Sequence, residues 1–241
     1  MSDAALAWIE RNDLASSAFW LALTIAIYVV ARRFQNATGG NPLANTVLVA
    51  ALPIMALLYA TGTPVSHYRD GGWPLLWLLG PATVALAVPL YMNFSTVRVA
   101  LLPMCVSLIV GSGLAVLSAV VLGDAMGASI ETVRSLAPKT VTTPIAMGIA
   151  TEIGGIPDLT AAFVIFTGII GAVSASAIFN LARIRDHRAR GFATGVAAGG
   201  IGTARAFQES FLAGTFSGVG MTLNGIITAI LLPFLWLLFT R

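Results

Sequence analysis

Charged residues divide the chain into long apolar stretches. With histidine counted as neutral, six uncharged stretches are each long enough for a transmembrane helix, which needs about 20 apolar residues. The first has a mixed-charge start and an uncharged run of 18 residues, which favours a retained helix over the alternative of a cleaved signal peptide. The expected spans are 14–32, 42–61, 73–92, 99–122, 158–182 and 211–239.

Two further stretches are interrupted. Residues 128–153 begin as a polar helix, break at Pro138 and restart with the sequence VTTPIAM. Residues 191–209 are rich in glycine and end in a charged turn. Irregular backbone at membrane depth must be buried in protein or line a cavity, and interrupted segments point to transporter binding sites. We therefore expect both stretches to help form a functional site.

The arginines predict the orientation, because basic residues favour the cytoplasmic side. Arg32 and Arg33 place the end of the first span inside and the N-terminus outside. The densest basic cluster, RIRDHRAR at 183–190, also belongs inside. Both conditions hold if 128–153 is a re-entrant hairpin that enters and leaves on one face. By the same logic 191–209 dips in from the inside, and the C-terminus is outside.

Composition agrees with a membrane protein. The chain has 241 residues, of which 57% are hydrophobic and 10% charged, against about 25% charged in a soluble domain. We expect an all-α polytopic membrane protein, with a polar tail over 1–13 and one transmembrane domain over 14–240. A faint similarity between 78–91 and 166–179 would fit an inverted repeat. Basic residues lie between apolar runs, so nucleic acid is not an expected partner.

Enzymatic and metal chemistry find little support. Cys105 is the only cysteine, so no intrachain disulfide and no cysteine-based zinc site can form. Two distant histidines and the lack of a carboxylate cluster argue against a metal site. No nucleophile and base stand at a recognisable spacing. We expect no enzymatic activity, no cofactor and no bound metal.

The first interrupted stretch carries a candidate anion site. Lys139 is the only lysine of the chain, and Thr140, Thr142 and Thr143 follow it. A helix that restarts after a break offers free N–H groups and a positive dipole end. Together these groups suit a small carboxylate. The alternative is that Lys139 reaches the lipid head groups as an interfacial side chain.

The second interrupted stretch carries a similar set. Gly200 and Gly202 allow close approach of the backbone, Thr203 supplies a hydroxyl, and the guanidinium of Arg205 matches a carboxylate. The alternative role for Arg205 is an ion pair with Glu209, four residues later in a helix. The two roles are compatible.

Three other polar residues interrupt apolar surroundings. Glu152 and Glu209 are candidates for proton coupling, unless each simply ends a segment in water. Asn224 lies in the middle of the last span, where either interhelical hydrogen bonding or substrate contact would explain it. Gly191, Gly195 and Gly199 form a four-residue repeat, which fits an oligomer face or an intramolecular helix contact equally well.

Several long motifs resemble the LrgB family, which includes the CidB-like proteins and the LrgB half of the plastidic glycolate/glycerate translocator. The resemblance covers most of the chain from about residue 41 onward. The motifs are LLGPATVALAVPLY (78–91), SLAPKTVTTPIAM (135–147), GGIPDLTAAFVIFTGIIGA (154–172), ARGFATGVAAGGIGTARAF (189–207) and GMTLNGIITAILLP (220–233).

The resemblance implies two kinds of function. Some members look like carriers of small monocarboxylates such as glycolate, glycerate, pyruvate or lactate. Others are named holin-like or antiholin-like regulators of murein hydrolase export and cell lysis. Members typically work with a small LrgA-like membrane protein. For this chain the resemblance implies such a partner, a place in the bacterial inner (cytoplasmic) membrane, and a homo- or hetero-oligomer.

One motif departs from the family pattern. Where the family commonly reads SHGIGTAR, this chain reads AGGIGTAR, with Ala198 and Gly199 in place of serine and histidine. A histidine there would be a natural proton acceptor, so its loss argues against histidine-based coupling here. The carrier function accounts best for Lys139 and Arg205. The alternatives are the lysis regulator and a subunit that only stabilises its partner.

Overall fold

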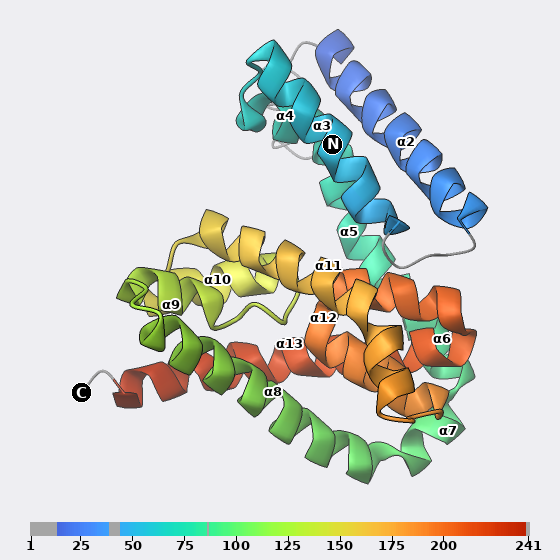
Figure 1. The fold of residues 1–241 in the computed structure, drawn as a ribbon, viewed down its shortest axis with the longest axis vertical. Coiled ribbons are helices and arrows are strands. Elements are labelled where there is room, and N and C mark those ends of the chain that lie inside the picture. Colours follow the sequence, from blue (N-terminus) through green and yellow to red (C-terminus); the bar gives the residue numbers. More distant parts are fainter. Residues whose placement is uncertain (1–13, 39–43, 86, 240–241) are drawn as a thin grey trace. The chain divides into compact units, whose positions relative to one another are not determined.

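The protein is described in a computed structural model, which defines residues 14–38, 44–85 and 87–239. The predicted polar tail over 1–13 lies outside the described residues. All twelve elements in the described part are helices (Figure 1). They fall into two compact units, Met1–Ala85 and Leu86–Arg241.

The N-terminal unit contains α2 (Leu14–Ala37), α3 (Thr46–Thr61), α4 (Val65–Gly71) and α5 (Trp73–Ala85). The side chain of Asn45 accepts the first free N–H groups of α3, and Gly62 ends that helix in the left-handed conformation. Trp20 packs in a small core with Ile54 and Leu58 of α3.

The C-terminal unit holds the two interrupted stretches. Its first four helices are α6 (Ala87–Met92), α7 (Phe94–Val99), α8 (Leu101–Ala125) and α9 (Ile130–Leu136). The last four are α10 (Thr143–Ile153), α11 (Pro157–Leu181), α12 (His187–Glu209) and α13 (Phe211–Phe239).

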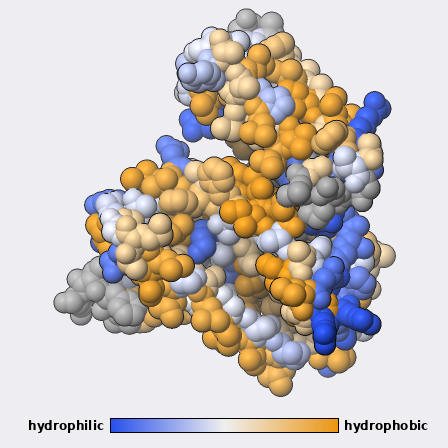
Figure 2. Space-filling model, in the orientation of Figure 1, coloured by the Kyte–Doolittle hydropathy of each residue, from blue (hydrophilic) through white to orange (hydrophobic). Residues whose placement is uncertain are grey.

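Among the described residues, four helices are long and apolar enough to cross a bilayer: α2, α8, α11 and α13. The 25 residues of α8 reach about 37 Å, enough for a hydrocarbon core of about 30 Å. Their bounds confirm four of the six expected spans. These helices, and the apolar side chains across the exterior (Figure 2), identify a multi-pass, all-α membrane protein.

Of the other two expected spans, one is shorter in the structure and one is helical throughout its described residues. The span expected over 42–61 is α3, which has 16 residues from Thr46 to Thr61; residues 42 and 43 lie outside the described part. The described residues of the span expected over 73–92 are helical, as α5 and α6, on either side of residue 86, which lies outside the described part. The side-chain amide of Asn93 donates to the carbonyl oxygen of Pro89 at 2.9 Å, and α6 ends there.

The stretch 128–153 forms α9, a break over 137–142 and α10. A Cβ atom on Gly123, near the end of α8, would lie 3.2 Å from the side chain of Val133 in α9. The hydroxyl of Ser135 in α9 accepts the N–H of Ile156, just before α11. The end of α8 and the start of α11 therefore both pack against α9, and the re-entrant topology stays a prediction (Figure 1).

The stretch 191–209 also folds back on itself. Gly199 interrupts α12 with φ 53° and ψ −137°. On a straight helix Arg190 and Glu209 would lie about 28 Å apart, yet their side chains form an ion pair of 2.5 Å. A Cβ atom on Gly202 would lie 2.9 Å from the carbonyl oxygen of Thr194, in the other half of α12. Hence α12 is a helical hairpin with its tip at Gly199.

The glycine repeat of α12 packs inside the chain. A Cβ atom on Gly191 would lie 2.1 Å from the carbonyl oxygen of Ala213, and one on Gly195 would lie 2.0 Å from that of Ser217. Both carbonyl groups belong to α13. These two glycines are therefore explained by an intramolecular backbone contact, one of the two uses that the sequence leaves open.

Candidate functional site

Asn224 joins the two hairpins to the spanning helices. It is fully buried in the middle of α13. Its amide donates to the carbonyl oxygen of Thr140 at 3.2 Å and to that of Val196 at 3.1 Å. Its own oxygen accepts the hydroxyl of Ser112, in α8, at 2.5 Å. We call these four residues the Asn224 junction.

The tips of the hairpins meet at this junction. Thr140 lies in the break between α9 and α10, and a Cβ atom on Gly199 would lie 3.6 Å from its carbonyl oxygen. The hydroxyl of Thr203 donates to the carbonyl oxygen of Gly199, and it also shares a hydrogen bond with the hydroxyl of Ser217. Carbonyl groups exposed by the two breaks are thus satisfied by side chains. Two stretches 60 residues apart in sequence form one buried polar centre.

The remaining residues of the first candidate set lie beside this centre. The ammonium of the half-buried Lys139 donates to the carbonyl oxygen of Ala115 in α8, at 3.1 Å. Thr142 occupies the N-cap position of α10 without a side-chain capping bond, and Thr143 begins the helix. The Lys139 side chain therefore reaches into the protein, toward α8. The alternative prediction was that it extends to the lipid head groups.

The second candidate set is only partly at the junction. Thr203 lies there, whereas Gly202 is buried against the other half of the α12 hairpin and Gly200 is exposed. Arg205 donates to the side-chain oxygen of Gln208 at 3.1 Å. Within the described residues, no hydrogen bond or ion pair joins Arg205 to the α9–α10 tip.

The alternative role for Arg205, an ion pair with Glu209, is not the pairing that the structure shows. Glu209 pairs with Arg190 and lies 3.7 Å from the imidazole of His187. The hairpin is the reason, because it returns Glu209 to the first turn of α12. The pairing also engages one of the two carboxylates considered for proton coupling. The other, Glu152, is exposed in the last turn of α10.

Arg190 has a structural role that the sequence did not reveal, because its basic cluster was used only to predict membrane orientation. Its side chain is 12% exposed, and besides Glu209 it donates to the side-chain oxygen of Asn180 and to the carbonyl oxygen of Ser176. Its guanidinium lies over the ring of Phe179, 5.5 Å from the centroid. Arg190 thus fastens both ends of the α12 hairpin to the end of α11. The polar Asn180 at the end of an apolar stretch was the one sequence signal for this.

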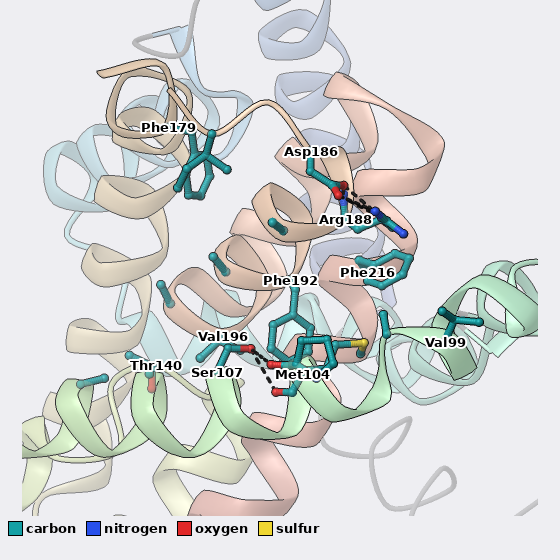
Figure 3. Close-up of a pocket in the computed structure, with 18 residues that line it drawn as sticks. Val99, Met104, Ser107, Thr140, Phe179, Asp186, Arg188, Phe192, Val196 and Phe216 are labelled. Carbon is teal, nitrogen blue, oxygen red and sulfur yellow. Dashed lines mark hydrogen bonds and ion pairs between the residues drawn. The ribbon is translucent and has the colours of Figure 1, made fainter. Parts of the chain in front are cut away.

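A pocket of about 720 Å³ opens between α8 and α12 (Figure 3). We call it the α8–α12 pocket. Most of its wall is apolar, and Thr140 is the one member of the Asn224 junction with a polar side chain that lines it. Asp186 and Arg188 lie at another part of the wall, on the approach to α12. Neither Lys139 nor Arg205 lines the pocket.

Asp186 caps α12 and holds a charged partner. Its carboxylate accepts the backbone N–H of Arg188 at 2.8 Å and forms a two-pronged ion pair with that guanidinium. Hydrogen bonds from the Arg188 side chain, followed by the backbone bond, lower the pKa of Asp186 to about 2. The carboxylate is therefore ionised at any physiological pH.

Known proteins resemble this chain over most of its length. The model of the LrgB-like family matches residues 24–238. The protein is 31% identical over 228 residues to "Holin-like protein CidB" of Staphylococcus epidermidis, covering 95% of this chain and 99% of that protein. It is 35% identical over 215 residues to "Uncharacterized protein YwbG" of Bacillus subtilis, covering 89% of this chain and 95% of that protein. No solved structure matches the chain.

A family match over residues 24–238, together with relatives that align over 89–95% of this chain, leaves no large segment of it outside the family pattern. The chain is a member of the LrgB-like family.

Proposed function

We propose that this protein is a holin-like component of the bacterial cytoplasmic membrane that regulates murein hydrolase export and cell lysis, and that it is not an enzyme. The similarity to a protein named holin-like, over 95% of this chain and 99% of that relative, is the observation that carries the proposal. The long apolar helices support a role within the bilayer. We further propose an LrgA-like small membrane protein as its partner, in a homo- or hetero-oligomer.

A carrier for small monocarboxylates is the second candidate. It is favoured by one specific observation: two helical hairpins meet tip to tip at the Asn224 junction. Carriers commonly build sites from discontinuous helices whose N-terminal ends face an anionic group. Here the start of α10 and the ammonium of Lys139 would receive glycolate, pyruvate or lactate. Arg205 bonds to Gln208 within its own hairpin, so Lys139 is the cation that supports this candidate.

One reconstitution separates the two functions. The protein would be placed in proteoliposomes with and without the LrgA-like partner, under an imposed pH gradient. A holin-like assembly would release an encapsulated anionic dye without saturation. A carrier would retain the dye and take up radiolabelled glycolate, pyruvate or lactate with saturation.

Lys139→Ala tests the carrier, and Arg69→Ala in α4 is the control, because it also removes one cation but lies far away in the sequence. If the protein is a carrier, Lys139→Ala abolishes uptake and Arg69→Ala does not. The holin-like assembly releases dye equally from both variants. Neither dye release nor uptake, from folded and inserted protein with its partner present, would contradict both functions and favour a stabilising subunit.

A further inference from the structure

Two rows of small side chains form the walls of the α8–α12 pocket. Ser107, Gly111 and Ala115 follow one another at four-residue intervals along α8, and Ala189, Ala193 and Ala197 do so along α12. Residues four apart share a helix face. The two rows therefore face a common space, which is hollow because none of these side chains is long enough to fill it (Figure 3).

The interior offers no strong polar group to a ligand. The hydroxyl of Ser107 donates to the carbonyl oxygen of Pro103 in its own helix, at 2.7 Å. Both the carbonyl and the hydroxyl oxygen of Thr140 accept from the amide of Asn224. A volume of about 720 Å³ is within the range of about 300–1,000 Å³ typical of ligand sites. A small carboxylate such as glycolate would leave most of this apolar space empty, whereas an alkyl chain would fill it.

The approach to the pocket is basic. Ile184, Asp186 and Arg188 line it. We call residues 183–188, which lead into the first turn of α12, the arginine loop; they also include Arg183 and Arg185, both exposed. Three arginines against the single carboxylate of Asp186 leave an excess of two positive charges. Sequence topology places this loop on the cytoplasmic side, where anionic lipids attract basic segments. An apolar interior with a basic mouth complements an amphiphile with an anionic head.

The walls are reachable from the surroundings. Ser107 on α8, and Ala193 and Ala197 on α12, are exposed although they line the pocket. On α8 the neighbouring outward residues are apolar and exposed, among them Val106 and Val110. The pocket is thus continuous with a surface of the kind that faces acyl chains.

We infer that the α8–α12 pocket holds one acyl chain of an anionic phospholipid, with the head group at the arginine loop (Arg183, Arg185 and Arg188). This site depends on neither of the functions proposed above. It would make the protein sensitive to the lipid composition of its own membrane.

Photo-crosslinking of the full chain in lipid vesicles tests the site. The probes are phosphatidylglycerol and phosphatidylcholine, each with a diazirine in one acyl chain, and labelled peptides are mapped by mass spectrometry. We expect phosphatidylglycerol to label the pocket faces of α8 and α12 more strongly than phosphatidylcholine does. Equal labelling by the two lipids, or labelling spread evenly around α8, overturns the inference.

Paired variants make the test specific. Ala193→Phe fills the pocket and should abolish labelling of its walls, while Ala177→Phe, on an exposed position of α11 outside the pocket, should not. Arg188→Gln should reduce the preference for phosphatidylglycerol without removing chain labelling. If Ala193→Phe, folded by circular dichroism, still labels like wild type, the chain lies elsewhere. Preferential labelling by a free diazirine fatty acid over phosphatidylglycerol would also contradict the lipid assignment.

Discussion

The side-chain amide of Asn224 donates to the carbonyl oxygen of Thr140 at 3.2 Å, and this bond joins α13 to the tip of the α9–α10 hairpin. The same amide serves the carbonyl oxygen of Val196, one turn before the tip of the α12 hairpin. One buried side chain therefore holds both interrupted segments in place. Its position in sequence, 84 residues from Thr140, makes the contact long-range.

Replacement of this amide should destabilise the protein. Asn224→Leu leaves the buried carbonyl oxygens of Thr140 and Val196 without their donor, and we expect a loss of about 1–3 kcal/mol in the free energy of unfolding. Thermal unfolding in detergent measures the effect. Asn36→Leu, at an exposed position of α2, is the control and should change little. Equal stability of the two variants would show that the Asn224 bonds add nothing.

The contact between α12 and α13 should tolerate no added side chain. In Gly195→Ala the new Cβ atom would lie 2.0 Å from the backbone carbonyl oxygen of Ser217, which cannot rotate away. We expect a loss at or above the upper end of the usual ~1–3 kcal/mol for overpacking. Gly113→Ala in α8 meets nothing within 4 Å and should gain roughly 0.5–1 kcal/mol of helix stability. Unfolding midpoints of the two variants should move in opposite directions.

The ion pair of Arg190 and Glu209 should be strongly coupled. Their side chains are 12% and 23% exposed, so solvent screens them little. A double-mutant cycle with Arg190→Gln and Glu209→Gln should give a coupling energy of about 1–3 kcal/mol. Arg188→Gln, which breaks an ion pair that is nearly half exposed, should cost under about 1 kcal/mol. If the effects of Arg190→Gln and Glu209→Gln are additive, the ion pair does not hold the two ends of the α12 hairpin together.

Asp186 should contribute stability that acid removes. Its pKa is about 2 in the folded protein and near 3.8 without its partners, so the contribution is present above pH ~4 and is lost as the pH falls to about 2. Because the side chain is 44% exposed, the contribution should stay under about 1 kcal/mol. Asp186→Asn keeps a capping side chain and should remove this pH dependence. The free energy of unfolding of the wild type and of Asp186→Asn, measured between pH 2 and pH 5, checks this prediction. The same dependence on pH in the two proteins would refute it.

Much of the fold could be predicted because the charges are so sparse. Uncharged runs gave the helices α2, α8, α11 and α13 closely, and Pro138 and the glycines around Gly199 marked both breaks. The start of the span expected over 42–61 was harder to predict, since the uncharged run around it is longer than α3, which begins at Thr46 after the cap of Asn45.

The site was predictable in part, for a physical reason. Thr140 and Asn224 are polar residues in apolar surroundings, so the need to satisfy them is visible in the sequence. Their partners are not visible, because backbone carbonyl groups such as that of Val196 carry no sequence signal. The pairing of Glu209 with Arg190 required knowing that α12 folds back. Local spacing instead favoured Arg205.

The close contact at Gly191 and Gly195 has a mechanical consequence. Because backbone touches backbone there, α12 and α13 form a stiff body whose internal spacing is fixed. Across the α8–α12 pocket, by contrast, a Cβ atom added to Gly111 would still find Val196 at an ordinary 3.6 Å. α8 therefore packs against α12 less closely than α13 does. A change in the width of the pocket would leave the spacing of α12 and α13 unchanged.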